Sequence, residues 1–124
     1  MIGKYKFEDL SKKIINAAIE VHKTLGPGFL ESLYEEALCL ELNKQDIKFE
    51  RQKDIKIYYE KQLIGNHRLD LLIENEIIVE LKAVRNLENI HFVVVKSYLK
   101  AMELKIALLL NFAKPILEIK RIVN

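Results

Sequence analysis

The chain has 124 residues, half of them apolar and 31% charged, which is typical of one globular domain over residues 1–124. The lone Cys39, the short apolar runs and the absence of a signal-peptide pattern in residues 1–10 argue against a secreted disulfide scaffold and against a membrane span, so a cytoplasmic protein is expected. A net charge of +2 neither requires nor excludes a nucleic-acid partner, so any such role must rest on a local site.

The first part of the sequence predicts a helical hairpin. Apolar residues recur at three- and four-residue spacing from Phe7 to Leu25, and the helix they predict must end at Gly26-Pro27-Gly28. A second helix is expected from about Leu30 to Gln45, packed on the first because the connection is short. Its outer face is predicted to carry Ser32, Glu35 and Glu36, and its buried stripe to carry Leu30, Leu33, Tyr34, Ala37 and Leu38.

The remainder predicts a sheet with one more helix. The expected strands are Ile55–Tyr59, Leu63–Ile73, Ile77–Val84, Lys105–Asn111 and Leu117–Val123, with a helix over Leu87–Leu104. The predicted fold class is therefore α/β, with a mixed β-sheet flanked by helices in the order ααβββαββ. Because Ile55–Tyr59 alternates like an exposed edge strand, it is a candidate for pairing with a second copy in a homodimer.

Three charged residues fall within apolar strands. Glu80 and Lys82 share one face of the strand Ile77–Val84, and Asp70 lies in similar surroundings on the preceding strand. Buried charges are costly unless they are paired or bind an ion. A two-residue turn at 74–75 would set Asp70 opposite Val79, whereas a three-residue turn over 74–76 sets it opposite Glu80, and we expect the second register.

Two adjacent carboxylates must share a proton or hold a hard cation. Asp70, Glu80 and the Leu81 carbonyl suit Mg²⁺ or Mn²⁺, which prefer oxygen ligands and retain waters. Such an ion can position a water and lower its pKa, while Lys82 neutralises charge on a phosphate. These are the parts needed for phosphodiester hydrolysis. Glu31, at the start of the second helix, is a fourth candidate, although the residue pattern alone favours a simple interaction with the helix dipole.

These residues also carry a family resemblance. Gly28-Phe29-Leu30-Glu31-Ser32-Leu33-Tyr34 matches the GxxExxY signature. Arg68–Leu72 followed by Val79-Glu80-Leu81-Lys82-Ala83 resembles the D…ExK core of PD-(D/E)xK nucleases. The chain is similar over nearly its whole length to the GxxExxY family, a small prokaryotic group within that superfamily. The resemblance implies a restriction-endonuclease-like sheet flanked by helices.

The resemblance implies a role for each matching residue. Asp70 and Glu80 would be ligands of Mg²⁺ or Mn²⁺, Lys82 would orient or activate the attacking water, and Glu31 would be an acidic helper. DNA or RNA would be the substrate, and the candidate accessory residues are His91, Tyr98 and Lys100. The sequence departs from the family where a glutamine is expected three residues after His91, because Val94 stands there.

Three functions therefore stay open. The first is a metal-dependent nuclease that acts on DNA or RNA. The second, motivated by Val94 and the modest net charge, is a catalytically weak or inactive nuclease-fold module that binds nucleic acid or a protein partner. The third is a structural salt-bridge cluster without chemistry. For His91, a position facing the site and packing at the start of its helix are equally open.

Overall fold

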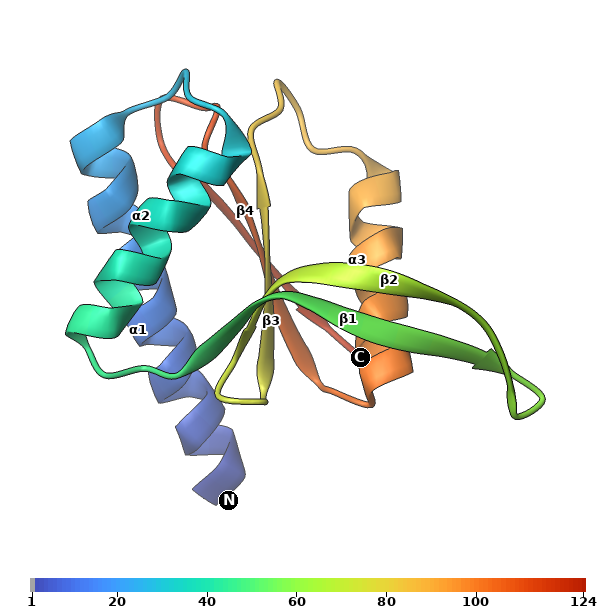
Figure 1. The fold of residues 1–124 in the computed structure, drawn as a ribbon. Helices are drawn as coiled ribbons and strands as arrows, with labels where there is room; N and C mark the ends of the chain where they lie inside the picture. The colour runs from blue at the N-terminus through green and yellow to red at the C-terminus, as the bar shows by residue number, and fades with distance from the viewer. Residues whose placement is uncertain (1) are drawn as a thin grey trace.

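The computed structural model describes residues 2–124, with side chains described from residue 7 onward. Three helices and five strands follow in the predicted order ααβββαββ (Figure 1). They are α1 (Ile2–Leu25), α2 (Glu31–Lys44), β1 (Phe49–Tyr59), β2 (Gln62–Ile73), β3 (Ile77–Lys82), α3 (Asn89–Met102), β4 (Ile106–Asn111) and β5 (Glu118–Val123). No helix among these residues is long and apolar enough to cross a membrane.

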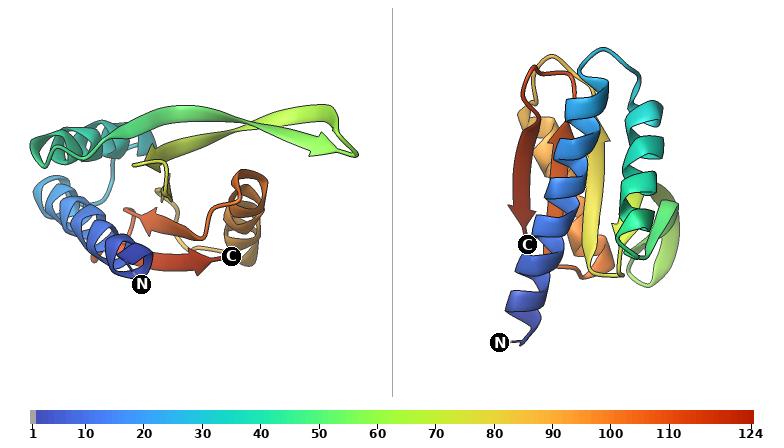
Figure 2. Two further views of the ribbon diagram at one scale, coloured as in Figure 1. Left: turned by 90° about the horizontal axis from the view of Figure 1, so that it is seen from below. Right: turned by 90° about the vertical axis from the view of Figure 1, so that its left-hand side faces the viewer.

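The strands form one mixed sheet in the order β1-β2-β3-β4-β5. Only β3 and β4 are parallel, and α3 is the crossover that joins them, as a parallel pair requires. The predicted edge position of Ile55–Tyr59 is confirmed, because β1 is an outer strand; its pairing with a second copy stays a prediction. Beyond the sheet, β1 and β2 continue as a long twisted hairpin, residues 56–67, which we call the arm (Figures 1 and 2).

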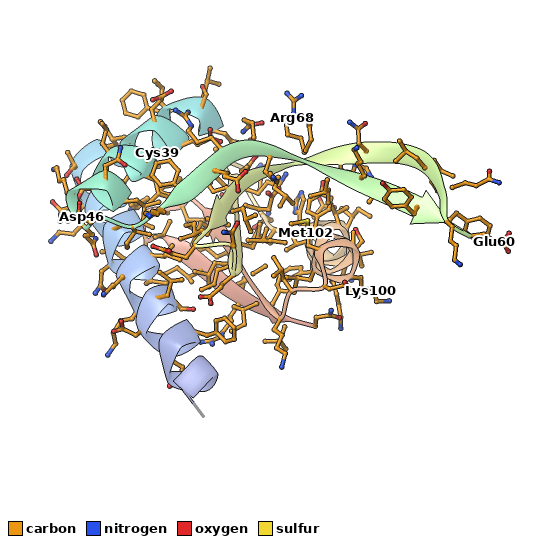
Figure 3. All side chains as sticks on the ribbon, turned by 60° about the horizontal axis from the view of Figure 1, so that its bottom comes forward. Cys39, Asp46, Glu60, Arg68, Lys100 and Met102 are labelled. Atoms are coloured by element: carbon orange, nitrogen blue, oxygen red, sulfur yellow. The ribbon has the colours of Figure 1, made fainter. Side chains whose placement is uncertain are left out.

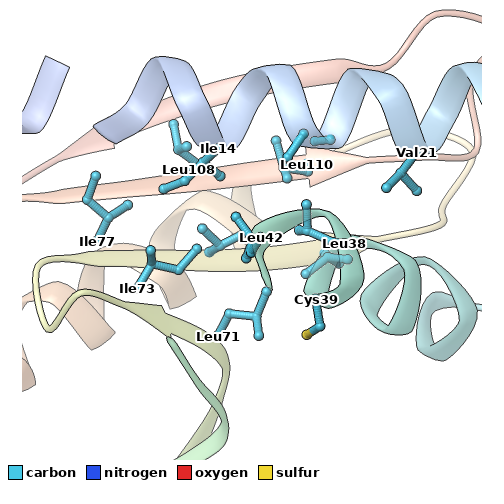
Figure 4. Close-up of a cluster of buried hydrophobic side chains, with 14 of the residues drawn as sticks. Ile14, Val21, Leu38, Cys39, Leu42, Leu71, Ile73, Ile77, Leu108 and Leu110 are labelled. Carbon is cyan, nitrogen blue, oxygen red and sulfur yellow. The ribbon is translucent and has the colours of Figure 1, made fainter. Parts of the chain in front are cut away.

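The helices cover both faces of the sheet. α1 and α2 pack on one face and α3 on the other, each over its own cluster of buried side chains (Figure 2). Alternation along β3 divides its residues between them: Val79 and Leu81 face α1 and α2, and Ile78 faces α3. Figure 4 shows the larger cluster, which includes Ile14, Val21, Leu38, Leu42, Leu71, Ile73, Ile77, Leu108 and Leu110.

The short connection between α1 and α2 is held by Tyr34. Its hydroxyl donates to the Gly26 carbonyl (2.6 Å) and accepts from the Phe29 N–H (3.1 Å). Its ring stacks on the ring of Phe112, with 4.5 Å between the two ring centroids. Gly28 has φ +116°, a conformation that side-chain-bearing residues rarely adopt. The spacing of Gly28 and Tyr34 in the GxxExxY pattern therefore has a direct structural reason: one permits the turn and the other fastens it.

The predicted buried stripe of α2 is partly wrong. Tyr34 and Leu38 are fully buried, but Leu30 and Leu33 are exposed, since the helix begins only at Glu31 and its buried side is rotated toward Cys39 and Leu42. This rotation also buries Glu35, which the sequence pattern predicts on the outer face.

Candidate functional site

The predicted three-residue turn is confirmed. Ile73 pairs with Ile77 and Leu71 with Val79, so Asp70 and Glu80 come next on neighbouring strands. Here side chains take over from the backbone ladder: the Asp70 N–H donates to Glu80 Oε2 (2.7 Å), and the Leu81 N–H donates to Asp70 Oδ2 (2.9 Å). The two carboxylates therefore lie side by side where β2 and β3 part.

Burial and mutual repulsion work against two negative charges on this pair. Glu80 is buried, and desolvation followed by the charge of Asp70 raises its pKa from 4.5 to about 8. Desolvation also raises the pKa of half-buried Asp70, with further repulsion from Glu35 and Glu31. Each carboxylate uses one oxygen for a backbone N–H, so Asp70 Oδ1 and Glu80 Oε1 remain for another partner. A positive charge placed between them would relieve the repulsion.

Lys82 and Tyr98 lie close enough to interact electrostatically with Asp70 and Glu80. Lys82 follows Glu80 on the same face of β3, and its charge lowers the pKa of both carboxyl groups against the dominant effect of burial. Tyr98 faces the pair from α3: burial raises its pKa first, and the charges of Glu80 and Asp70 raise it further. Val94 precedes Tyr98 by one helical turn, so it lies on the same stripe of α3.

Glu31 joins the site from the first turn of α2. Its Oε1 accepts from the Ala83 N–H at 3.3 Å, immediately after Lys82, and its charge raises the pKa of Asp70 and of Glu80. The structure therefore brings the four predicted residues together from three elements: the adjacent strands β2 and β3, and α2, which lies earlier in the chain. The dipole of α2 also favours a carboxylate at this position.

Two of the candidate accessory residues lie elsewhere. His91 caps α3: its Nδ1 accepts from the Glu88 N–H (2.9 Å), which settles its position in favour of helix-start packing. Lys100 lines a groove beside the arm with Lys56 and His67. Among the contacts of the described residues, none joins His91 or Lys100 to a carboxylate of the pair.

A second acidic residue of α2 belongs to this region. Glu35 is 7% exposed, not on the outer face as predicted, and lines an open cavity of about 420 Å³ with Glu31, Gln52 and Asp70. Arg51 donates to Glu35 Oε2 through Nε (3.1 Å) and Nη2 (3.0 Å). The sequence held a signal for this placement, because Glu31 and Glu35 are one helical turn apart and an inward Glu31 implies an inward Glu35.

Gln52 distorts β1 opposite the pair. Arg51 pairs with Leu71 and Lys53 with Leu69, so Gln52 stands across from Asp70, and its φ of +50° lies in the left-handed region. That conformation costs about 1 kcal/mol in a residue with a side chain. The Gln52 amide holds it in place by donating to Glu35 Oε1 (2.9 Å). Backbone strain of this kind gathers at functional sites. Nothing in the sequence pattern predicted it.

Asn111 fixes the chain that follows Lys82. It is fully buried at the end of β4, where its Oδ1 accepts from the Val84 N–H (3.1 Å) and its Nδ2 donates to the Val84 carbonyl (2.9 Å). Because β4 is parallel to β3 and pairs Asn111 with Lys82, this side chain secures the carboxyl end of the strand that bears Glu80.

The ligand set for a metal is small. Within residues 2–124, no group of three or more His, Cys, Asp or Glu side chains is arranged to hold an ion. The donors are therefore the two free oxygens of Asp70 and Glu80, together with backbone oxygen and water. Mg²⁺ is commonly bound by one or two carboxylates and keeps several waters, so the residues present fit such an ion.

Comparison with known proteins places the fold. A family model described as the PD-(D/E)XK nuclease superfamily matches residues 8–122, and the chain belongs to this superfamily. Its nucleases generally use divalent metal ions. A crystal structure of the protein SSO0001 is similar, with a TM-score of 0.61 and 15% sequence identity; the match covers 97% of this chain and 60% of that one, and shows a shared fold. No curated protein matches the sequence significantly.

Proposed function

We propose that this protein is a divalent-metal-dependent nuclease that hydrolyses phosphodiester bonds in DNA or RNA, and that it belongs to the GxxExxY group of its superfamily. One observation carries the proposal: Asp70 and Glu80 lie side by side with a raised pKa, and each keeps one carboxylate oxygen free of backbone N–H donors. A structural salt bridge would hold a cationic side chain against the carboxylates, whereas no ion pair of the described residues includes Asp70 or Glu80.

Asp70 and Glu80 are the residues that would hold Mg²⁺ or Mn²⁺. The Leu81 carbonyl is a third candidate, because the Leu81 N–H points toward β2 and the carbonyl of the same strand residue points the same way. When bound, such an ion neutralises the carboxylates, polarises a phosphate oxygen and lowers the pKa of a coordinated water. Ligation by the carboxylates requires that both lose their protons, so binding strengthens as pH rises.

Lys82 and Glu31 act on the reacting groups in this proposal. The Lys82 ammonium follows Glu80 on the same face, where it can donate to a phosphate oxygen and stabilise the charge that develops at phosphorus. It is also the residue that would orient the attacking water. Glu31 contributes a third negative charge at the mouth of the cavity and, through its hydrogen bond to Ala83, holds the chain after Lys82.

Val94 favours a second candidate function. It lies on the stripe of α3 that carries Tyr98, where its isopropyl group offers no hydrogen bond to a phosphate or water. A nuclease-fold module that binds nucleic acid or a protein partner without appreciable turnover would tolerate this residue. The Val94→Gln variant separates the two functions, since an amide at this position raises cleavage only if the rest of the site is active.

A cleavage assay tests the proposal. Purified protein is incubated with single- and double-stranded DNA and RNA in Mg²⁺ or Mn²⁺, with EDTA as the metal-free reference. We expect metal-dependent cleavage that is lost in Asp70→Asn and retained in Asp46→Asn, which changes an exposed aspartate at a left-handed position that asparagine also tolerates. No cleavage above the Asp70→Asn background, in wild type and in Val94→Gln alike, would reject it.

A further inference from the structure

A groove with basic walls runs between the arm and α3. It has a volume of about 490 Å³; Lys56, Tyr58 and His67 line it from the arm, and Ser97 and Lys100 line it from the helix. Figure 3 shows Lys100 on α3 below the arm, whose far end carries Glu60. The arm extends past the body of the protein (Figures 1 and 2). It forms one wall of this groove, which suggests that the arm serves binding.

The charge of the groove favours a polyanion. Lys56 and Lys100 are exposed and stand on opposite walls, and neither takes part in an ion pair within the described chain. On the strands beside them the other basic groups are neutralised: Arg68 pairs with Asp54 (3.1 Å) and Lys53 with Glu50 (3.0 Å). Two uncompensated ammonium groups facing one channel are complementary to successive phosphates of a nucleic-acid backbone.

Tyr58 supplies an aromatic surface to the same groove. Consecutive strand residues normally point to opposite faces, yet both Ile57 and Tyr58 line the groove, because the register of the arm shifts between them. Such bulges re-aim side chains. Tyr58 is 58% exposed, so the face of its ring is available for stacking with a base. Stacking on an aromatic ring requires a base that is not paired within a duplex.

One wall of the groove belongs to β2, the strand that carries Asp70. The centroid of the His67 ring, in the groove, lies 5.6 Å from that of the Tyr98 ring on α3. His67 also stands only three residues before Asp70 on β2. A nucleic-acid strand that follows β2 from His67 would therefore run toward Asp70.

We propose that the groove between the arm and α3 binds a single strand of nucleic acid, with phosphates at Lys56 and Lys100 and a base stacked on Tyr58, and directs it to Asp70 and Glu80. This inference rests on the proposed function, of which it specifies the substrate: an unpaired strand, held through phosphate and base. Because the groove recognises neither sugar nor sequence, DNA and RNA strands are expected to bind alike.

Fluorescence anisotropy in EDTA measures this binding without cleavage. The probes are labelled 12-nucleotide oligo(dT) and oligo(U) and a 12-base-pair DNA duplex. We expect both single strands to bind at least tenfold more tightly than the duplex. Tyr58→Ala should weaken binding about tenfold, as expected for the loss of one stacked base, and Tyr58→Phe should keep it. The matched control is Tyr59→Ala, which removes the neighbouring exposed tyrosine from outside the groove lining.

Salt dependence tests the two lysines. The double variant Lys56→Ala/Lys100→Ala should lower the slope of log K against log salt by about 1.4, the value for two phosphate contacts on a single strand. The control, Lys12→Ala/Lys23→Ala, removes the same charge from exposed positions of α1 on the other side of the sheet. Three results would overturn the inference: an equal decrease of the salt slope in both double variants, a duplex bound as tightly as a single strand, or a Tyr58→Ala variant that binds like wild type.

The outcomes of the binding and cleavage assays are independent. If the groove variants weaken strand binding as described but no metal-dependent cleavage occurs, the groove stands and the proposed nuclease activity fails. If the protein cleaves and the groove variants bind and cleave like wild type, the nuclease stands and the groove inference fails.

Discussion

Glu80→Gln should stabilise the metal-free protein at alkaline pH. The amide oxygen can still accept the Asp70 N–H, but no charge is buried. Because the pKa of Glu80 is raised from 4.5 to about 8, the folded state binds this proton more tightly than the unfolded state does. Stability from this group is therefore fully present below the unfolded pKa and is lost as pH rises toward the folded pKa. Between pH 5 and pH 8 the loss amounts to about 3 kcal/mol, because the slope approaches 1.36 kcal/mol per pH unit between the two pKa values and is smaller near each of them.

Urea unfolding of wild type and variant in EDTA at pH 5, 6.5 and 8 measures this difference. The advantage of Glu80→Gln over wild type should grow by about 3 kcal/mol across that range. Glu20→Gln, which changes an exposed carboxyl of α1, should show no such growth. An advantage that does not increase with pH, or a variant less stable than wild type at pH 8, would refute the reasoning that burial and the adjacent Asp70 disfavour the Glu80 carboxylate.

Three further substitutions test parts of the site. Lys82→Met should keep metal binding and change the free energy of unfolding by less than about 1 kcal/mol, because Lys82 makes no ion pair in the described chain. It should lower the cleavage rate at least about 100-fold, because in the proposed function the Lys82 ammonium donates to the phosphate. Arg51→Met should cost about 1–3 kcal/mol in urea unfolding, since it leaves the buried Glu35 carboxylate with only Gln52 as a side-chain partner. Tyr34→Phe should cost about 1–3 kcal/mol in the same assay, as it leaves the Phe29 N–H and the Gly26 carbonyl without their partner.

The order of elements could be predicted because each element has a clear apolar period and a definite stop. Gly26-Pro27-Gly28 ends α1, and the three-residue turn before Ile77 fixes the register that brings Asp70 to Glu80. A slip of one residue would have placed them on opposite faces, so this part of the site followed from local spacing alone.

The surroundings of the pair could not be predicted in the same way. Glu35 lies on the buried side of α2, and the cost of burying its carboxylate is offset by Arg51 from β1, a contact that the periodicity of α2 does not encode. The left-handed conformation of Gln52 and the register shift between Ile57 and Tyr58 are local irregularities of β1, which the apolar periodicity of the sequence does not encode. Lys100, a candidate accessory residue, lines the neighbouring groove, whose other wall is formed by the arm.

The most direct test of the central claim is a titration with Mn²⁺, followed by electron paramagnetic resonance of the free ion. The account predicts one tight Mn²⁺ site per chain at pH 8, at least tenfold weaker in Asp70→Asn and in Glu80→Gln, and unchanged in Asp46→Asn. Wild type should bind Mn²⁺ more weakly at pH 5.5 than at pH 8, because the raised pKa of Glu80 keeps that carboxyl protonated at pH 5.5. Equal Mn²⁺ binding by wild type and Asp70→Asn would contradict the assignment of a metal centre to this pair.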